Sequence, residues 1–479
     1  MRRLLPFSFL RLDEETVLLV NECGDFTFLS PDQFKRLTGP ALQDDDELPP
    51  SLESRHFLAE GDLALPLELM ATKYRTRKGF LRNFTALHMM VVTVRCNQRC
   101  KYCQVSSEDE QAHTFDMSPD VAQKIVECIF QSPGEDIKIE FQGGEPVLNW
   151  KAVTTAIEYA EALNRQHHKR VEFVICTNLT IIKPEQLEYL RDHQVAISTS
   201  LDGPREIHDA NRRLRTGGGT YDLFLEHLDL ARKICGDRVS ALMTTTQANL
   251  HALRDVVDEY LRQGFPGIFF RSLNPFGFAA TDKAALGYPP EAFTRAFIDG
   301  LDYILSLNFK GTPFVEYFTA LLLQRILTPF PTGFVDLQSP AGTGICGVIY
   351  DYNGDVYPSD ESRMLARMGD ASFRMGNVFT NTYQEIFLGE TLRHLVSNSC
   401  VETLPGCADC AYSIYCGADP VRNYLEVRDI VGHRPTSGLC RIHKGLFNHL
   451  FRTIRRADEN VLDLFWAWAT GRDLAEVQA

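Results

Sequence analysis

The sequence predicts an α/β fold, because short apolar segments alternate with amphipathic helical patterns through the middle of the chain. Six segments have strand character: Leu87–Val94, Ile137–Phe141, Val171–Cys176, Val195–Ser200, Val239–Thr245 and Gly267–Leu273. Five amphipathic patterns lie between them: Pro119–Phe130, Lys151–Leu163, Pro184–Asp192, Tyr221–Lys233 and Leu250–Gln263. This alternation predicts a parallel sheet with right-handed crossovers, and six units are fewer than a closed eight-fold barrel requires.

A smaller unit is expected before this core. Val17–Val20 and Phe26–Leu29 flank a turn and predict a hairpin, after which Ser30 and Pro31 begin a short helix that runs through Leu37. We expect four regions, namely an α+β unit over 1–83, the core over 84–315, a cysteine-rich region over 316–445 and C-terminal helices over 446–479.

The composition is that of a cytoplasmic globular protein. The chain has 479 residues and a formal net charge of −14, which disfavours non-specific nucleic-acid binding. No secretory signal is expected, and no segment approaches the roughly 18 apolar residues of a membrane span. The thirteen cysteines therefore indicate metal or redox chemistry. Four of them stand singly in apolar patterns and are expected to be small buried side chains: Cys23, Cys128, Cys176 and Cys235.

Cys96, Cys100 and Cys103 form a C-x3-C-x2-C group directly after the first core strand. A structural zinc site normally has four protein ligands, whereas three thiolates can hold a [4Fe-4S] cluster with one iron left open. An open metal position is typical of a catalytic site. The alternatives are three unrelated thiols and a zinc site with a distant fourth ligand.

Two further segments occur at the ends of predicted strands, Gly143-Gly144-Glu145-Pro146 and Ser200-Leu201-Asp202-Gly203-Pro204. Together with the cysteine triplet, and in this order, they resemble the motifs of the radical S-adenosylmethionine (SAM) enzymes. The resemblance implies an open, partial (β/α)6 barrel of the TIM type, with the cysteine loop at the carboxyl end of the first strand, where barrel sites are built.

The same resemblance implies the cofactors and the residues that bind them. Cys96, Cys100 and Cys103 would hold the [4Fe-4S] cluster, and SAM would chelate its open iron. Electron transfer from a donor such as flavodoxin or ferredoxin would cleave SAM to a 5′-deoxyadenosyl radical. The other expected SAM-binding residues are Tyr102 near the adenine, Gly143, Gly144, Glu145 and Pro146 near the amino group, and Ser200 and Arg212 near the ribose and carboxylate.

A second cysteine group comprises Cys407, Cys410, Cys416 and Cys440. Four thiolates suit either a [4Fe-4S] cluster or a structural zinc. The region resembles the SPASM extension of peptide-modifying radical SAM enzymes, whose full pattern has seven cysteines for two auxiliary clusters.

The chain departs from that pattern at two positions, because Ser359 and Pro420 stand where cysteines are usual. The resemblance therefore implies one auxiliary [4Fe-4S] cluster, on Cys407, Cys410, Cys416 and Cys440. Cys346 would be left without a cluster, and Cys400 would be a spectator or a substitute ligand.

Asp360 follows Ser359 at a position where sulfatase-maturing relatives carry a carboxylate base, although an exposed loop aspartate is the plain alternative. Segments that include Leu18–Glu22 and Tyr357–Met364 resemble the HxsB-type maturases of the His-Xaa-Ser system. This implies a ribosomally made peptide substrate with His-Xaa-Ser repeats and a paired second radical SAM maturase. A separate hypothesis is that the N-terminal unit docks a leader segment, as small strand-plus-helix units do in peptide-modifying enzymes. The alternatives are a formylglycine-forming sulfatase maturase, a tRNA-modifying enzyme and a non-catalytic zinc scaffold.

Overall fold

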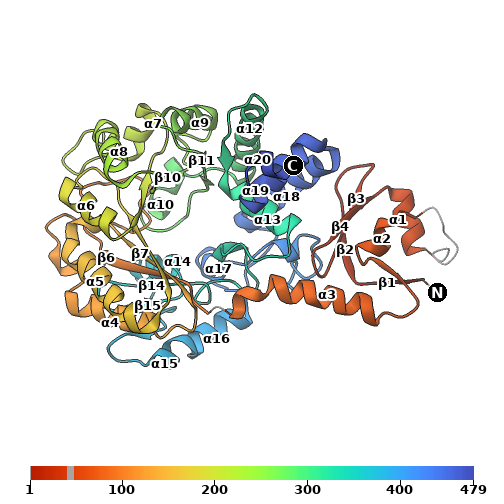
Figure 1. The fold of residues 1–479 in the computed structure, drawn as a ribbon, viewed down its shortest axis with the longest axis horizontal. Helices are drawn as coiled ribbons and strands as arrows, with labels where there is room; N and C mark the ends of the chain where they lie inside the picture. Colours follow the sequence, from red (N-terminus) through yellow and green to blue (C-terminus); the bar gives the residue numbers. More distant parts are fainter. Residues whose placement is uncertain (1, 40–47, 83, 479) are drawn as a thin grey trace. The chain divides into compact units, whose positions relative to one another are not determined.

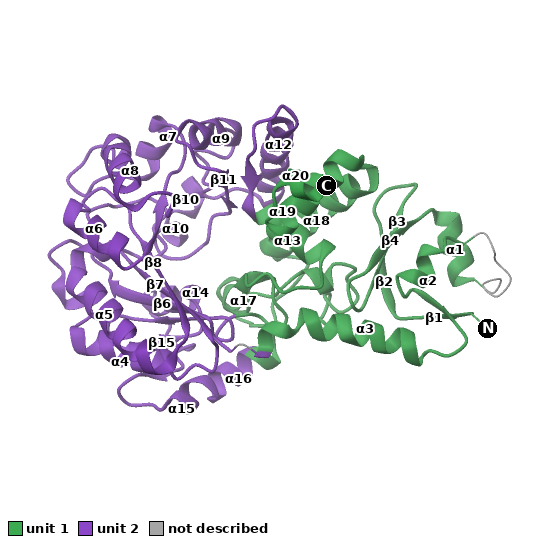
Figure 2. Cartoon of the chain, viewed as in Figure 1, with its two compact units in different colours: residues 1–81, 318–342, 396–479 green, residues 82–317, 343–395 purple. Residues whose placement is uncertain are grey.

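The computed structural model describes residues 2–39, 48–82 and 84–478. The chain folds into two compact units, and each unit is discontinuous in the sequence (Figures 1 and 2). Unit 1 comprises residues 1–81, 318–342 and 396–479, and unit 2 comprises residues 82–317 and 343–395.

Unit 2 is built on a sheet with the strand order β12-β10-β9-β8-β7-β6-β14-β15-β16. The neighbouring strands from β12 to β14 are parallel, and β15 and β16 are antiparallel additions at one edge. This confirms the predicted α/β class. The strands are β6 (Leu87–Thr93), β7 (Asp136–Gly143), β8 (Arg170–Cys176), β9 (Ala196–Ser200), β10 (Val239–Thr244), β12 (Phe270–Arg271), β14 (Gly347–Tyr350), β15 (Asp355–Tyr357) and β16 (Gly376–Asn377).

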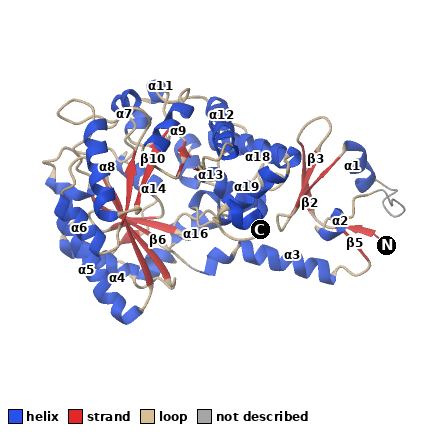
Figure 3. Cartoon of the chain, turned by 45° about the horizontal axis from the view of Figure 1, so that its top comes forward, coloured by secondary structure: helices blue, strands red, loops and turns tan. Residues whose placement is uncertain are grey.

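Helices connect the parallel strands of unit 2, and Figure 3 shows α4, α5, α6 and α8 along one side of the sheet. The five predicted crossover helices are confirmed as α4 (Pro119–Ile129), α5 (Trp150–His167), α6 (Pro184–Asp192), α8 (Tyr221–Cys235) and α9 (Leu253–Arg262). Further helices are α7 (Arg205–Asn211), α10 (Phe278–Thr281), α11 (Lys283–Leu286), α12 (Pro290–Phe309), α14 (Asp360–Arg367), α15 (Tyr383–Phe387) and α16 (Glu390–Ser397).

The two faces of the sheet differ in polarity. On β7 the side chains of Ile139 and Phe141 are fully buried, whereas Glu140 and Gln142, which point to the opposite face, are half-buried. On β8, Ile175 is buried and Cys176 points the other way. We call the face that carries Glu140, Gln142 and Cys176 the inner face. The inner face carries polar side chains, whereas the side chains of the opposite, outer face pack into the apolar core.

Two strands differ from expectation. The predicted strand over Gly267–Leu273 is interrupted, because β11 (Gly267–Ile268) pairs with β13 (Val315–Glu316) while β12 pairs with β10. The buried Glu316 carboxylate accepts the backbone N–H of Phe270 at 3.0 Å, which takes up a strand donor at the break. In addition, β14 was not predicted; it pairs in parallel with β6, in the register Gly347↔Leu87.

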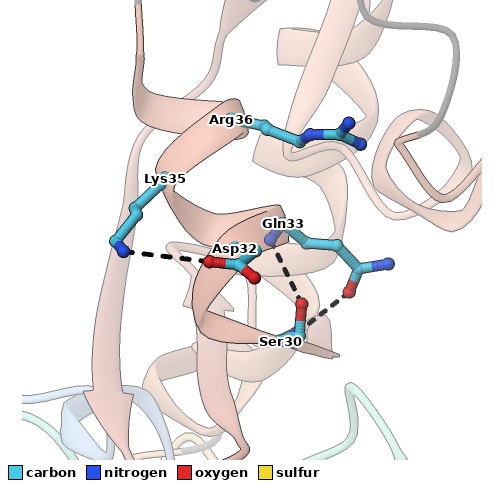
Figure 4. A pocket seen from close by; sticks show the side chains of 5 residues that line it. All are labelled: Ser30, Asp32, Gln33, Lys35 and Arg36. Atoms are coloured by element: carbon cyan, nitrogen blue, oxygen red, sulfur yellow. Dashed lines mark hydrogen bonds and ion pairs between the residues drawn. The ribbon is translucent and has the colours of Figure 1, made fainter.

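Unit 1 contains a three-stranded antiparallel sheet of β2 (Phe7–Arg11), β3 (Val17–Asn21) and β4 (Phe26–Leu29), and a pair of β1 (Arg2–Leu4) with β5 (Leu58–Glu60). The predicted hairpin and the helix after it are confirmed. Ser30 caps α1, since its Oγ accepts from Gln33 N at 3.2 Å while Gln33 Oε1 accepts from Ser30 N at 2.9 Å (Figure 4). The helices are α1 (Pro31–Thr38), α2 (Ser51–Ser54), α3 (Ala64–Arg77), α13 (Tyr317–Leu327), α17 (Pro420–Val427), α18 (Gly438–Arg456), α19 (Glu459–Thr470) and α20 (Leu474–Gln478).

Across the described ranges, every helix is too short or too polar to cross a lipid bilayer.

Candidate active site

The first cysteine loop begins immediately beyond β6 and carries three thiols. Cys96 is buried, and Cys100 and Cys103 are half-buried. Burial raises the pKa of the Cys96 thiol well above its usual value, and the neighbouring Cys100 raises it further. Burial also raises the pKa of Cys100 to about 12, with Cys103 adding to the effect. The three thiols therefore lie within electrostatic reach of one another.

Arg95 anchors the start of this loop. Its buried guanidinium binds both carboxylate oxygens of Asp116, and its terminal nitrogens donate to the carbonyls of Glu110 and Leu148 at 2.7 and 2.8 Å. The buried Arg95 side chain thus binds one carboxylate at two points and two backbone carbonyls. These contacts hold the start of the cysteine loop in one position.

The glycine pair that was expected near the amino group of SAM packs against the end of β6. A Cβ on Gly143 would overlap the carbonyl oxygen of Thr93, and a Cβ on Gly144 would overlap that of Arg95. The backbone N–H of Gly144 donates to Thr93 O at 2.8 Å. Glycine is therefore required at both positions by the close approach of two backbone segments.

Glu145 continues this segment into the interior. Its fully buried carboxylate accepts from Thr177 Oγ1 and from Asn178 N, both at 2.7 Å, and burial raises its pKa to about 7. The amide Nδ2 of Asn178 lies 3.8 Å from Cys96 Sγ. Pro146 begins a short 3-10 turn. The Gly143–Pro146 segment thus lies directly beside the first cysteine.

Tyr102 and Arg212 meet at a buried carboxylate that the sequence analysis did not assign. The Tyr102 hydroxyl donates to Asp202 Oδ2 at 2.7 Å, and Arg212 Nε donates to the same oxygen at 3.2 Å. The Arg212 guanidinium also lies over the Tyr102 ring, 5.3 Å from its centroid. Asp202 belongs to the Ser200–Pro204 segment, so the motif itself was the available signal.

Two further residues lie beside this group. Ser200 is the last residue of β9, and by strand alternation it shares the inner face with Ser198, the register partner of Cys176. Asn211 precedes Arg212; its carbonyl accepts from Lys101 N at 2.9 Å, and its buried Nδ2 lacks a hydrogen-bond partner among the described residues. A buried donor left open beside the cysteine loop fits a bound ligand there.

Ser359, which stands where the resemblance expects a cysteine, has a structural task. It is the N-cap of α14, because its Oγ accepts from Ser362 N at 3.3 Å while Ser362 Oγ accepts from Ser359 N at 3.0 Å. Asp360 is consequently the first residue of α14.

Asp360 interacts with a polar group on the inner face. Burial raises its pKa to about 7, Glu361 and Glu140 raise it as well, and Arg363 and Arg271 oppose them. The pKa of this carboxyl therefore lies closer to neutral pH than that of an exposed aspartate, which fits the expected role of a base.

The expectation that Cys176 is a plain apolar residue was wrong. Its thiol donates to Glu140 Oε1 at 3.2 Å from the neighbouring strand, on the inner face. The signal was the alternation on β8, which places Cys176 opposite Phe173 and Ile175.

The second cysteine group lies in unit 1. The pKa of Cys416 is raised to about 12, most by burial and then by Cys410, Cys407 and Cys440, so the four thiols lie within electrostatic reach of one another. Cys400 is also in unit 1, whereas Cys346 directly precedes β14 in unit 2. Within the described segments, no three His, Cys, Asp or Glu side chains converge as ligands of one bare metal ion.

Comparison with known proteins gives the family of the core. Residues 90–259 match the Radical SAM superfamily. A cysteine-type anaerobic sulfatase-maturating enzyme of Clostridium perfringens (strain 13 / Type A) is 23% identical over 377 residues, which are 76% of this chain and 96% of that protein.

Two solved structures share the fold. Native anSMEcpe with bound AdoMet and Cp18Cys peptide aligns with a TM-score of 0.66 and 19% identity over 77% of this chain and 98% of that one. Streptococcus suis SuiB bound to precursor peptide SuiA aligns with a TM-score of 0.55 and 13% identity over 91% and 99%. The matched residues 90–259 include the three cysteines, the Gly143–Pro146 segment, Asp202 and Arg212. The match over residues 90–259 therefore indicates a radical SAM domain in this chain, and domains of this kind use SAM and a [4Fe-4S] cluster for enzymatic chemistry.

Proposed function

We propose that this enzyme modifies a ribosomally made peptide or protein, of the His-Xaa-Ser repeat type, by hydrogen abstraction. The observation that carries the proposal is the radical SAM match that includes the cysteine loop, together with Asp360, the first residue of α14, as the candidate base. A peptide carries both the C–H bond and the acidic or basic groups that such a site can act on. The peptides named with anSMEcpe and SuiB support the same substrate class.

The residues of the chain divide the work as follows. Cys96, Cys100 and Cys103 hold the cluster; bound SAM and the cluster supply the 5′-deoxyadenosyl radical that removes a hydrogen atom from the substrate. Tyr102, Ser200, Arg212 and the Gly143–Pro146 segment bind SAM. Asp360 takes a proton from the substrate after hydrogen abstraction, because its raised pKa suits transfer near neutral pH.

The remaining parts serve electron transfer and substrate delivery. Cys407, Cys410, Cys416 and Cys440 would hold one auxiliary [4Fe-4S] cluster, which would supply one-electron redox chemistry. An external donor such as flavodoxin or ferredoxin reduces the first cluster. Residues 1–83 dock the leader segment of the peptide, and a second radical SAM maturase works on the same substrate in the cytoplasm.

A second candidate function is the maturation of sulfatases, in which a cysteine or serine becomes formylglycine. The 23% identity to a sulfatase-maturating enzyme over 76% of this chain favours it. Ser359 and Pro420 speak against it, because the resemblance expects cysteine ligands of a further cluster there. Transfer RNA modification is disfavoured by the net charge of −14.

The experiment is a comparison of peptides under anaerobic conditions with reductant and SAM. We expect 5′-deoxyadenosine and a changed peptide mass with a His-Xaa-Ser repeat peptide that carries its leader, and no product from the Cys96/Cys100/Cys103 triple alanine variant. Formylglycine in a sulfatase-derived peptide, with the repeat peptide unchanged, would establish the second candidate instead. No product with either peptide, despite a filled and reducible cluster, would contradict both candidates.

A further inference from the structure

A buried histidine lies against one of the four cysteines of unit 1. His443 Nδ1 is 3.4 Å from Cys416 Sγ, and the histidine side chain is only 4% exposed. The ring of Phe318 is 6.1 Å away, centroid to centroid. An imidazole in these surroundings gains little from water, so its contact with the sulfur is a dominant polar interaction of Nδ1.

The start of α18 fixes this arrangement. Ser437 caps the helix and accepts from Cys440 N at 3.3 Å. His443 follows Cys440 by three residues, so both side chains lie on the same face of the helix. One helix end therefore supplies a thiol and, one turn later, a ring nitrogen directed at another thiol of the same group.

A buried polar side chain without a hydrogen-bond partner belongs to the segment that contacts Gly417. Gly417 follows Cys416, and a Cβ on Gly417 would lie 2.9 Å from the backbone nitrogen of Gln338, so the two segments are in contact. Gln338 is 0% exposed, and neither its Oε1 nor its Nε2 has a hydrogen-bond partner among the described residues. A fully buried amide without partners is rare in folded proteins and indicates that another group completes it.

The charges around the thiols agree with an anionic occupant. The cations Arg434 and Lys444 lie close enough to Cys407 to interact with it electrostatically. Lys444 interacts in the same way with the half-buried Cys410. Four thiols, two cations and buried nitrogen groups are a suitable shell for an iron–sulfur cluster, whose potential depends on charge and on hydrogen bonds to sulfur.

We propose that His443 is a positioning residue of the auxiliary cluster, and that its Nδ1–H donates a hydrogen bond to the sulfur of Cys416. This inference rests on the proposed function, because it requires a cluster on the four cysteines. A thiolate ligand has no proton to donate, so Nδ1 carries the hydrogen. A donor to sulfur stabilises the more negative, reduced cluster and therefore raises its reduction potential.

The test uses the full chain in the Cys96/Cys100/Cys103 triple alanine background, where only the auxiliary cluster remains. Three variants are compared with the parent protein that keeps His443. His443→Asn keeps an N–H near the Nδ1 position, His443→Gln moves the N–H to the Nε2 position, and His443→Leu removes it. His449→Leu is the control on the same helix. The readouts are iron and zinc content, the electron paramagnetic resonance spectrum and the midpoint potential.

We expect about four irons per chain in all five proteins. His443→Gln and His443→Leu should favour the oxidised cluster by about tenfold, which for one electron is a potential lower by about 59 mV. His443→Asn and His449→Leu should keep the parent potential. Iron lost in the Leu and Gln variants but kept in the Asn variant would also support the donor role.

Two results separate the failures. Zinc or no metal in the parent protein would contradict the auxiliary cluster itself, and with it the proposed function of the four cysteines. A parent with about four irons and equal potentials in the Asn, Gln and Leu variants would overturn the role of His443 alone. Loss of iron in both His443→Asn and His443→Leu would also overturn the role of His443, because His443→Asn keeps the N–H donor.

Discussion

Arg95 and Asp116 form a two-point ion pair, in which Nε lies 2.7 Å from Oδ1 and Nη2 lies 2.8 Å from Oδ2. Arg95 is almost fully buried, and the next residue in the chain is Cys96. The pair therefore sets the position from which the cysteine loop departs.

Replacement of Asp116 by alanine should lower the free energy of unfolding by about 3 kcal/mol, because it leaves the buried Arg95 charge without its partner. Urea denaturation of the metal-free protein measures this. The matched control is Asp136→Ala, which removes the carboxylate of an exposed pair with Arg170 and should have no measurable effect. Equal losses in the two variants would show that the Arg95 pair is not a special constraint.

Replacement of Gly144 by alanine should prevent the cysteine loop from closing on β7. The added Cβ would overlap the carbonyl oxygens of Arg95 and Val94, which are backbone atoms and cannot rotate away. We expect loss of the first cluster, measured as about four fewer irons per chain. Gly79→Ala is the control, since a Cβ there meets nothing within 4 Å, and it should retain all iron.

Replacement of Asp202 by asparagine should weaken SAM binding about tenfold, which corresponds to about 1.4 kcal/mol. The change keeps the shape of the side chain and removes the charge that orients Arg212 and Tyr102. Calorimetric titration of the reconstituted protein with SAM measures the affinity. Asp209→Asn, which alters a carboxylate that accepts from Thr220 and Tyr221 backbone groups, should leave it unchanged. SAM affinity preserved in Asp202→Asn would refute the orienting role.

Product formation should rise with pH through about 7 if Asp360 is the base. Burial and Glu361 raise its pKa to about 7, and only the ionised form, present above that pH, accepts a proton. Asp360→Asn should still make 5′-deoxyadenosine but lose the peptide product at every pH. Asp370→Asn, beyond the end of the same helix, should keep the product and its pH profile. A variant at 360 with normal product would remove Asp360 from the mechanism.

Replacement of Cys346 by alanine should leave about eight irons per chain, because Ser359 and Pro420 stand where further cysteine ligands of a second auxiliary cluster would be needed. Cys416→Ala should reduce the content by up to about four. Elemental analysis decides, and about twelve irons in the parent protein would indicate a second auxiliary cluster and contradict the single-cluster proposal.

The alternating core was predictable because its strands carry apolar residues at every second position. Ile137, Ile139 and Phe141 of β7 are an example, and all three are buried. The strand β14 was not predictable in the same way, since four buried residues, Gly347–Tyr350, have no alternation to read. What makes them a strand is the free edge of β6, more than 250 residues earlier in the chain.

The candidate site shows the same limit. Spacing within one loop identified Cys96, Cys100 and Cys103, and short motifs identified the segments around Gly143 and Ser200. The contacts of Glu140 with Cys176 and of Cys416 with His443 could not be predicted from the sequence. Each contact depends on how separate elements pack. The role of Ser359 as a helix cap could have been read from the serine three residues later.

The pairing of β14 with β6 also constrains how the protein is made. Residues 82–317 alone would leave β6 as an open edge, ready to pair with another chain. During synthesis the sheet of unit 2 is completed only after residues 343–395 have left the ribosome, and unit 1 must wait for residues near the C-terminus. A nascent chain with this strand order therefore keeps an open strand edge for much of its translation, and such an edge favours chaperone binding during synthesis.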